Sequence, residues 1–194
     1  MPSFFGVRMP FDPSVTRQID GILNSAKPRH ALALMLGMAD CYNQTAELAL
    51  GRMAATNNAD YAAPALMNRS FAIELLLKLF IVAADLSVKT NDDLKEAKLD
   101  LHGHVFSKLF ARLDQDSKKS IAKRYQDLSG EPTSYHRFND LLIKTGDKPF
   151  VEWRYAHEIT ERKDIDFNLL TLICESLGQV AFDLVKTRTQ LLGA

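Results

Sequence analysis

Residues 150–158, FVEWRYAHE, combine side chains that could bind a phosphate and move a proton. The guanidinium of Arg154 can bind two phosphate oxygens, and the imidazole of His157 titrates near neutral pH. The two residues are three positions apart, so they share one face if the segment is helical. We therefore treat Arg154 and His157 as candidate catalytic residues, with Tyr155 and Glu158 beside them as candidate binding residues.

The same segment can instead be read as a packing element. Aromatic residues at helical spacing usually lie in a core, which would bury Phe150 and Trp153. Arg154 and Glu158 would then form an i,i+4 ion pair. The sequence leaves both interpretations open.

Residues 68–86, NRSFAIELLLKLFIVAADL, form the most apolar run of the chain and contain Arg69, Glu74 and Lys78. Apolar residues recur at three- and four-residue steps and also fill much of the remaining surface, which predicts a central bundle helix. Glu74 and Lys78 stand in the favourable i,i+4 order for an ion pair. Either this pair is solvated at the edge of the buried face, or Glu74 is buried and needs a cation, for which Arg154 is a candidate. We treat Arg69, Glu74 and Lys78 as candidate binding residues.

His102 and His104 flank Gly103. Ligands at i and i+2 point apart on a helix, and no cysteine or carboxylate stands at a standard spacing beside them, so we predict no metal site. His104 is a further candidate binding residue, at the start of a short helix. Because the sequence has no glycine-rich phosphate loop and no nucleophile motif, we expect no cofactor.

The composition is that of a soluble globular domain. The 194 residues are 46% hydrophobic and 25% charged, and the formal net charge is zero. A dedicated duplex-DNA binder usually has a basic excess, so this class is disfavoured. Cys41 and Cys174 lie far apart and indicate a reducing compartment. We expect no signal peptide and no membrane span, and hence a cytoplasmic protein.

Helical periodicity and capping signals predict an all-α, up-and-down bundle. An N-terminal extension, residues 1–28, would hold one helix that starts at Asp12 and Pro13. The bundle, residues 29–190, would contain helices over about 29–56, 61–86, 104–113, 117–128, 134–144 and 166–188, with one turn at 92–97. In the second helix of the chain we expect one stripe to face the core: Leu34, Met38, Cys41, Thr45 and Leu48.

Three blocks of residues give the chain a resemblance to the HEPN superfamily, the higher-eukaryote and prokaryote nucleotide-binding domains. They are NRSFAIELLLKLF at 68–80, LHGHVFSKLFARL at 101–113 and FVEWRYAHE at 150–158. Their order and separation fit, and the resemblance covers roughly residues 30–188. It implies an all-α bundle that dimerises.

Many HEPN proteins are metal-independent ribonucleases of defence systems, and others bind nucleotides, partner with nucleotidyltransferases or have lost catalysis. The ribonuclease members carry an Arg and a His with a longer gap than the two residues between Arg154 and His157. The resemblance therefore implies a non-catalytic homodimer that binds a nucleotide, an RNA or a protein partner in a bacterial defence or stress context. The alternative is an endoribonuclease that uses Arg154 and His157, and a purely structural interaction module also remains open.

Overall fold

The computed structural model describes residues 30–149 and 166–192, with side chains as far as residue 189. The described part is all-α, and its only extended pairing is an isolated antiparallel bridge between His30 and Thr90. The predicted extension, residues 1–28, lies outside the described residues. The elements are α2 (Ala31–Thr56), η1 (Ala59–Tyr61), α3 (Ala62–Ala83), α4 (Asn91–Glu96), α5 (Phe106–Ala111), α6 (Gln115–Ser129), α7 (Tyr135–Lys144) and α9 (Phe167–Leu192).

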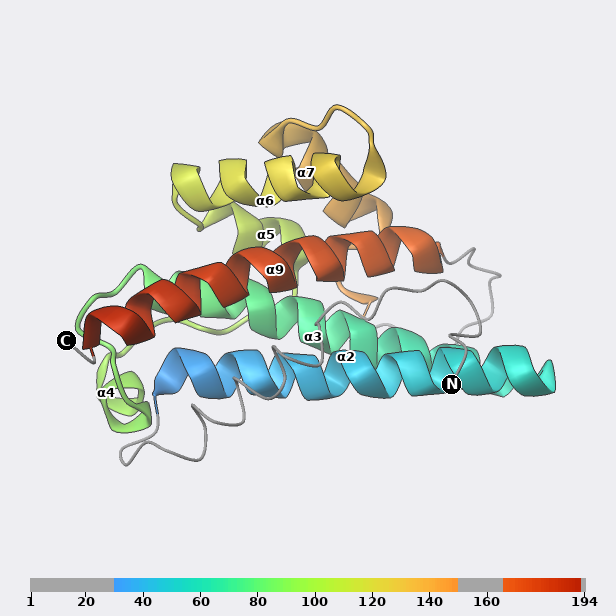
Figure 1. Ribbon diagram of the computed structural model, residues 1–194, viewed down its shortest axis with the longest axis horizontal. Coiled ribbons are helices and arrows are strands. Elements are labelled where there is room, and N and C mark those ends of the chain that lie inside the picture. The colour runs from blue at the N-terminus through green and yellow to red at the C-terminus, as the bar shows by residue number, and fades with distance from the viewer. Residues whose placement is uncertain (1–29, 150–165, 193–194) are drawn as a thin grey trace.

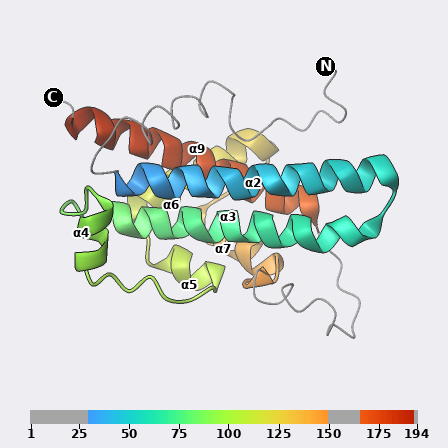
Figure 2. The same ribbon diagram turned by 90° about the horizontal axis from the view of Figure 1, so that it is seen from below.

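The long helices α2 and α3 form an antiparallel hairpin, joined through η1 (Figure 2). α9 crosses this hairpin and contacts α3 and α2 (Figure 1). It runs in the same direction as α3, because the excursion through α4–α7 carries the chain back before α9 begins. The expected up-and-down order therefore holds for α2 and α3 and does not extend to the third long helix.

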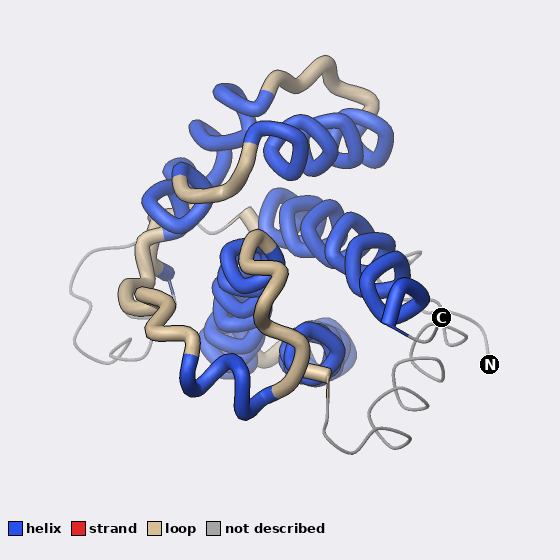
Figure 3. The backbone as a smooth tube through the Cα atoms, turned by 90° about the vertical axis from the view of Figure 1, so that its left-hand side faces the viewer, coloured by secondary structure: helices blue, strands red, loops and turns tan. Residues whose placement is uncertain are grey.

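The short helices α5, α6 and α7 lie over the long ones, with α6 against α9 and α5 against α3 (Figures 1 and 3). Their starts follow local capping chemistry. Asp114 accepts a hydrogen bond from the backbone N–H of Ser117, and Ser134 accepts one from that of Arg137. Gly130, with φ of 75°, ends α6 in the left-handed conformation that suits glycine. Asp166 caps α9 through Leu169 N–H at 2.9 Å, as predicted.

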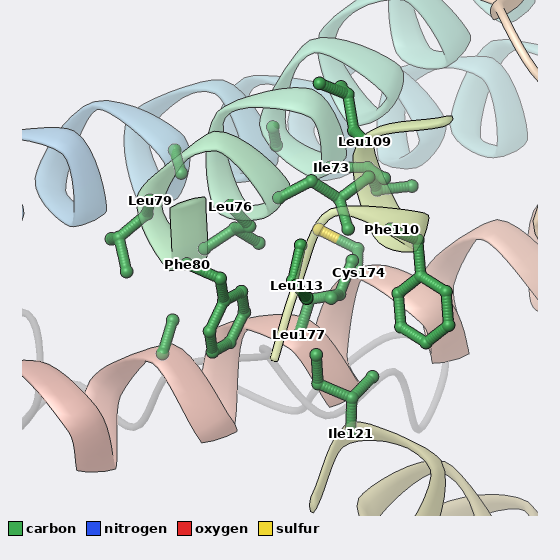
Figure 4. Packing of buried hydrophobic residues seen from close by; sticks show 14 of the residues in the cluster. Ile73, Leu76, Leu79, Phe80, Leu109, Phe110, Leu113, Ile121, Cys174 and Leu177 are labelled. Atoms are coloured by element: carbon green, nitrogen blue, oxygen red, sulfur yellow. The ribbon is translucent and has the colours of Figure 1, made fainter. Parts of the chain in front are cut away.

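The hydrophobic core takes residues from α2, α3, α5, α6, α7 and α9, and Figure 4 shows the part of it around α3, α5, α6 and α9. α3 supplies its centre, because its buried residues lie on nearly every side of the helix. This agrees with the prediction of a central helix at 68–86. The labelled core side chains of Figure 4 come from all four helices: Ile73, Leu76, Leu79, Phe80, Leu109, Phe110, Leu113, Ile121, Cys174 and Leu177.

The predicted core stripe of α2 is wrong: it faces outward. Met38 is 42% exposed and Leu48 75%, and Cys41 and Thr45 are also exposed. The buried face instead carries polar residues among small and apolar ones: Leu32, Leu36, Ala39, Asp40, Asn43 and Ala46. The pattern misled because polar groups of this face find partners inside the protein, which apolar periodicity does not register.

In the described ranges, one helix segment, 167–189, has the length and hydropathy of a membrane span. Of its most apolar window, 56% is buried inside the protein. Core helices can have the same length and hydropathy.

The orientation of α2 predicts opposite outcomes for two identical substitutions on one helix. Leu36 is fully buried, so Leu36→Ala should lower the free energy of unfolding by roughly 2–5 kcal/mol. The matched control is Leu48→Ala, which should change it by less than about 0.5 kcal/mol when both variants are measured at a protein concentration at which the chain is monomeric. Chemical denaturation followed by circular dichroism measures both. A larger loss for Leu48→Ala would show that the predicted stripe is the buried one after all.

Candidate functional site

Glu74 is a buried carboxylate that contacts the side-chain nitrogens of two residues. Its side chain is 1% exposed. Oε1 accepts a hydrogen bond from Lys78 Nζ at 2.7 Å, and Oε2 lies 2.9 Å from Nδ1 of His104. A carboxylate withdrawn from water needs such partners, since an unpaired buried charge is strongly destabilising. Of the two sequence interpretations, the structure therefore agrees with an interior Glu74.

The two partners of Glu74 reach the surface to different degrees. The Lys78 side chain is 15% exposed, and that of His104 is 48% exposed. Lys78 lies one turn further along α3, whereas His104 comes from the loop that precedes α5. The three side chains form what we call the Glu74 cluster. It joins the central helix to the layer of short helices.

The loop that carries His104 is fixed on both sides of the histidine. Gly103 has φ of 99°, a conformation that residues with a Cβ rarely adopt. After His104, the chain enters α5, and Asp147 holds this start. Its carboxylate accepts hydrogen bonds from the N–H and the Oγ of Ser107, both at 2.7 Å, and its carbonyl accepts one from Phe106 N–H at 2.7 Å. The position of His104 thus depends on a residue more than forty positions away.

Arg69, a candidate binding residue, lies in the interior. It is 2% exposed, and its guanidinium donates to Glu47 on α2 and, at 3.1 Å, to Thr171 Oγ1 on α9. The side chain therefore ties the three long helices together from within. The contacts of Arg69 hold the helices together in the interior, and they do not form a surface that a ligand could reach.

The buried polar residues near Arg69 were not among the sequence candidates. Asp40 and Asn43 on α2 are 3% and 0% exposed, and Glu175 on α9 is 8% exposed. The thiol of Cys174 donates to Asn43 Oδ1 at 3.4 Å, and complete burial raises the pKa of this thiol to about 12. One sequence feature could have predicted this buried polar face. The spacing of Asp40, Asn43 and Glu47 places them on one side of a helix.

The catalytic candidates Arg154 and His157, with Tyr155 and Glu158, lie outside the described residues. The expected contact of Arg154 with Glu74 lies outside them as well. Within the described part, Glu74 contacts Lys78 and His104. Sequence reasoning named both as binding candidates and paired Lys78 with Glu74, but it did not pair His104 with Glu74 across 30 positions.

The Glu74 cluster can bind an anion more readily than a metal ion. It offers one ammonium group and one imidazole at the surface, and its carboxylate is already shared between them. In residues 30–149 and 166–192, no group of three or more His, Cys, Asp or Glu side chains is placed to hold a metal ion. Comparisons of this chain with known protein families, with curated proteins and with solved structures find no match.

Removing the positive charge of Lys78 should leave the buried negative charge of Glu74 without its ammonium partner. Lys78→Met is expected to lower the free energy of unfolding by up to roughly 3–5 kcal/mol. Adding Glu74→Gln should restore most of this loss, because the buried charge is then gone. Lys95→Met is the matched control, since Lys95 pairs with Asp92 at 76% exposure and should contribute less than about 1 kcal/mol. Urea denaturation gives all four values, and equal midpoints for the two lysine variants would contradict a buried pair.

Proposed function

We propose that this protein is a non-catalytic, HEPN-like helical homodimer that binds the phosphate of a nucleotide or an RNA at the Glu74 cluster. The observation that carries the proposal is the buried Glu74 carboxylate, which holds a lysine ammonium and a half-exposed histidine side by side. Two of the three blocks behind the resemblance, 68–80 and 101–113, contribute these residues. The chemistry of the cluster is thus built from the parts of the chain that suggested the family.

The geometry suits recognition of an anion. Glu74 binds His104 through Nδ1, and the His104 side chain is 48% exposed. Lys78 provides a fixed positive charge next to it. A phosphate at this rim would meet one permanent cation and one group that can become cationic, while the negative charge of Glu74 lies behind them.

The absence of catalysis is proposed from sequence spacing. Arg154 and His157 are closer together than the residues of the ribonuclease members, and productive geometry tolerates little displacement of reacting groups. A protein partner such as a nucleotidyltransferase, a defence or stress context and a cytoplasmic location stay predictions of the resemblance and the composition.

The dimer is proposed through the outward face of α2. Leu34, Met38, Cys41, Thr45 and Leu48 recur at alternating steps of four and three, the spacing of a coiled-coil seam. Isolated exposed apolar residues are common, but here Met38 and Leu48 lie on one face of one long helix. In a two-fold antiparallel pair, the midpoint of this seam is Cys41, so Cys41 of one copy would face Cys41 of the other.

The binding proposal predicts weak, salt-sensitive affinity for single-stranded RNA or ATP, in about the 10⁻⁴–10⁻⁶ M range of non-specific nucleic-acid binding. The variant Glu74→Gln with Lys78→Met should fold and bind at least about tenfold more weakly, because the charge-assisted contact is lost. His104→Ala should also weaken binding. Fluorescence anisotropy with a labelled RNA pool, and calorimetry with ATP, measure these affinities.

Lys95→Met is the control with the same change of residue type, and it should bind as the native protein does. Native-like affinity in both cluster variants would exclude the Glu74 cluster as the site. The same RNA, incubated with protein and a chelator, tests catalysis. Cleavage by the native protein that is absent in His157→Ala would establish the ribonuclease alternative instead.

The dimer proposal predicts a disulfide between copies at Cys41. Mild oxidation should give a covalent dimer on a non-reducing gel, and Cys41→Ser should abolish it. Cys174→Ser should leave it unchanged, because Cys174 is fully buried and its raised pKa keeps it in the thiol form. Light scattering under reducing conditions checks the non-covalent state. A monomer mass at micromolar concentration would rule out the dimer.

A further inference from the structure

One end of the bundle contains a cavity of about 160 Å³ that none of the candidate residues lines. The start of α2, the end of α3 with the turn after it, and the last turns of α9 meet there (Figure 3). Leucine, valine and alanine side chains form the apolar part of its wall. The polar part comes from His30, Asp85, Lys89 and Arg188. The cavity is large enough for several water molecules, and so for a small anion.

Arg188 supplies a fixed positive charge in this wall. One of its guanidinium nitrogens donates to the carbonyl of Ala83, the last residue of α3, at 2.6 Å. This contact compensates the negative end of the α3 dipole and fixes the guanidinium in place. Among the described residues, no carboxylate forms an ion pair with Arg188, so its charge is not neutralised by a neighbouring side chain in that part of the chain.

His30 supplies a donor or acceptor that the described structure leaves unused. Its Nδ1 is buried and has no hydrogen-bond partner among the described residues. Burial lowers the pKa of His30, and the positive charge of Arg188 lowers it further, so the imidazole is neutral at pH 7. His30 is also a residue of the cavity wall, so a ligand held in the cavity would lie beside it.

The start of α2 adds to the positive potential. His30 is its N-cap residue and makes no capping hydrogen bond through its side chain, and the first turn contains no acidic residue. Within the described ranges, no acidic side chain of the first turn offsets the positive end of this 26-residue helix, which begins directly after His30. The backbone holds this start in place, because Ala31 N–H donates to the carbonyl of Lys89 at 3.0 Å.

The charges of the wall leave a positive excess. Lys89 and Arg188 carry two permanent positive charges, against one from Asp85. The Oδ1 atom of Asp85 accepts hydrogen bonds from the N–H and Oγ of Ser87, at 2.9 and 2.7 Å. These bonds lower the pKa of Asp85, so it stays ionised. They also hold Oδ1 against residue Ser87 of the turn after α3.

We propose that this cavity binds a small oxyanion, a phosphate group, between Arg188 and His30 at the start of α2. The site is separate from the Glu74 cluster: Glu74 lies nine residues before Ala83 on α3, roughly 13 Å along the axis. Failure of one site therefore does not decide the other. The phosphate can be free in solution or the terminal group of a nucleotide.

A bound oxyanion favours the protonated form of His30 and so raises the pKa that burial and Arg188 lower. Binding is then coupled to proton uptake, and affinity rises as the pH falls from neutral towards 6. Phosphate changes its own charge in this range. Sulfate keeps its charge, so the pH dependence is measured with sulfate.

The test is calorimetric titration of the full chain with inorganic phosphate at fixed ionic strength, and with sulfate at pH 7.5 and 6.0. We expect saturable millimolar binding of phosphate, tighter sulfate binding at pH 6.0, and roughly a tenfold loss of affinity in Arg188→Gln, the size of a charge-assisted hydrogen bond. His30→Gln should abolish the pH dependence. Arg137→Gln is the control, because Arg137 is 56% exposed and pairs with Glu131 elsewhere on the surface.

Circular dichroism verifies the fold of each variant, and Lys89→Gln replaces Arg188→Gln if that variant does not fold. A parallel titration with AMP identifies the source: tighter binding than phosphate indicates a nucleotide, and equal binding indicates the free ion. Absence of saturable phosphate binding at pH 6.0 would overturn the proposal. Equal affinity of the native protein, Arg188→Gln and His30→Gln would overturn it too.

Discussion

Charges buried between the long helices determine how the remaining elements are arranged. Arg69 on α3 is almost fully buried, and its partners come from both α2 and α9. Glu74, one to two turns further along the same helix, takes a partner from the loop before α5. Because a buried charge without a counter-charge is costly, each contact restricts where a neighbouring element can lie. Both layers of the fold, the long helices and the short helices, are therefore positioned by α3. Its polar contacts contribute to this as much as its apolar surface does.

Helix positions were predictable from sequence where the determinants are local. Asp166 caps α9 as predicted, and the helices expected at 117–128 and 134–144 are present as α6 and α7, capped by Asp114 and Ser134. The inward face of α2 was not predictable in this way. Its buried side carries Asp40 and Asn43, and its exposed side carries Met38 and Leu48, so the rule that apolar residues face inward selects the wrong side. The rule fails because the polar groups have partners that apolar periodicity does not register: Asp40 accepts a hydrogen bond from Gln44 on the same helix, and Asn43 accepts one from Cys174 on α9.

In the candidate site, too, some features follow from local sequence and others depend on residues that are distant in sequence. The i,i+4 spacing of Glu74 and Lys78 indicated their ion pair, but not whether it was buried. His104 decides the geometry, and its position depends on Gly103 and on Asp147, whose hydrogen bonds span 40 positions. A local sequence pattern cannot predict the contact between Asp147 and Ser107. Asp147 is a common type of turn residue and Ser107 is a common residue at a helix start, and neither indicates the other. Arg154 and His157 lie outside the described residues, so the interpretation of residues 150–158 still depends on sequence.

The placement of α9 bears on how the chain folds. α2 packs on α3, the next long helix in the sequence, and Asp147 closes residues 106–147 into a second unit. Within each unit the contacts span fewer positions than the contacts of α9 with α2 and α3, so less loop-closure entropy opposes their formation. α9 packs on both α3 and α6. Residues 167–192 must therefore be present before the two units can share one complete core.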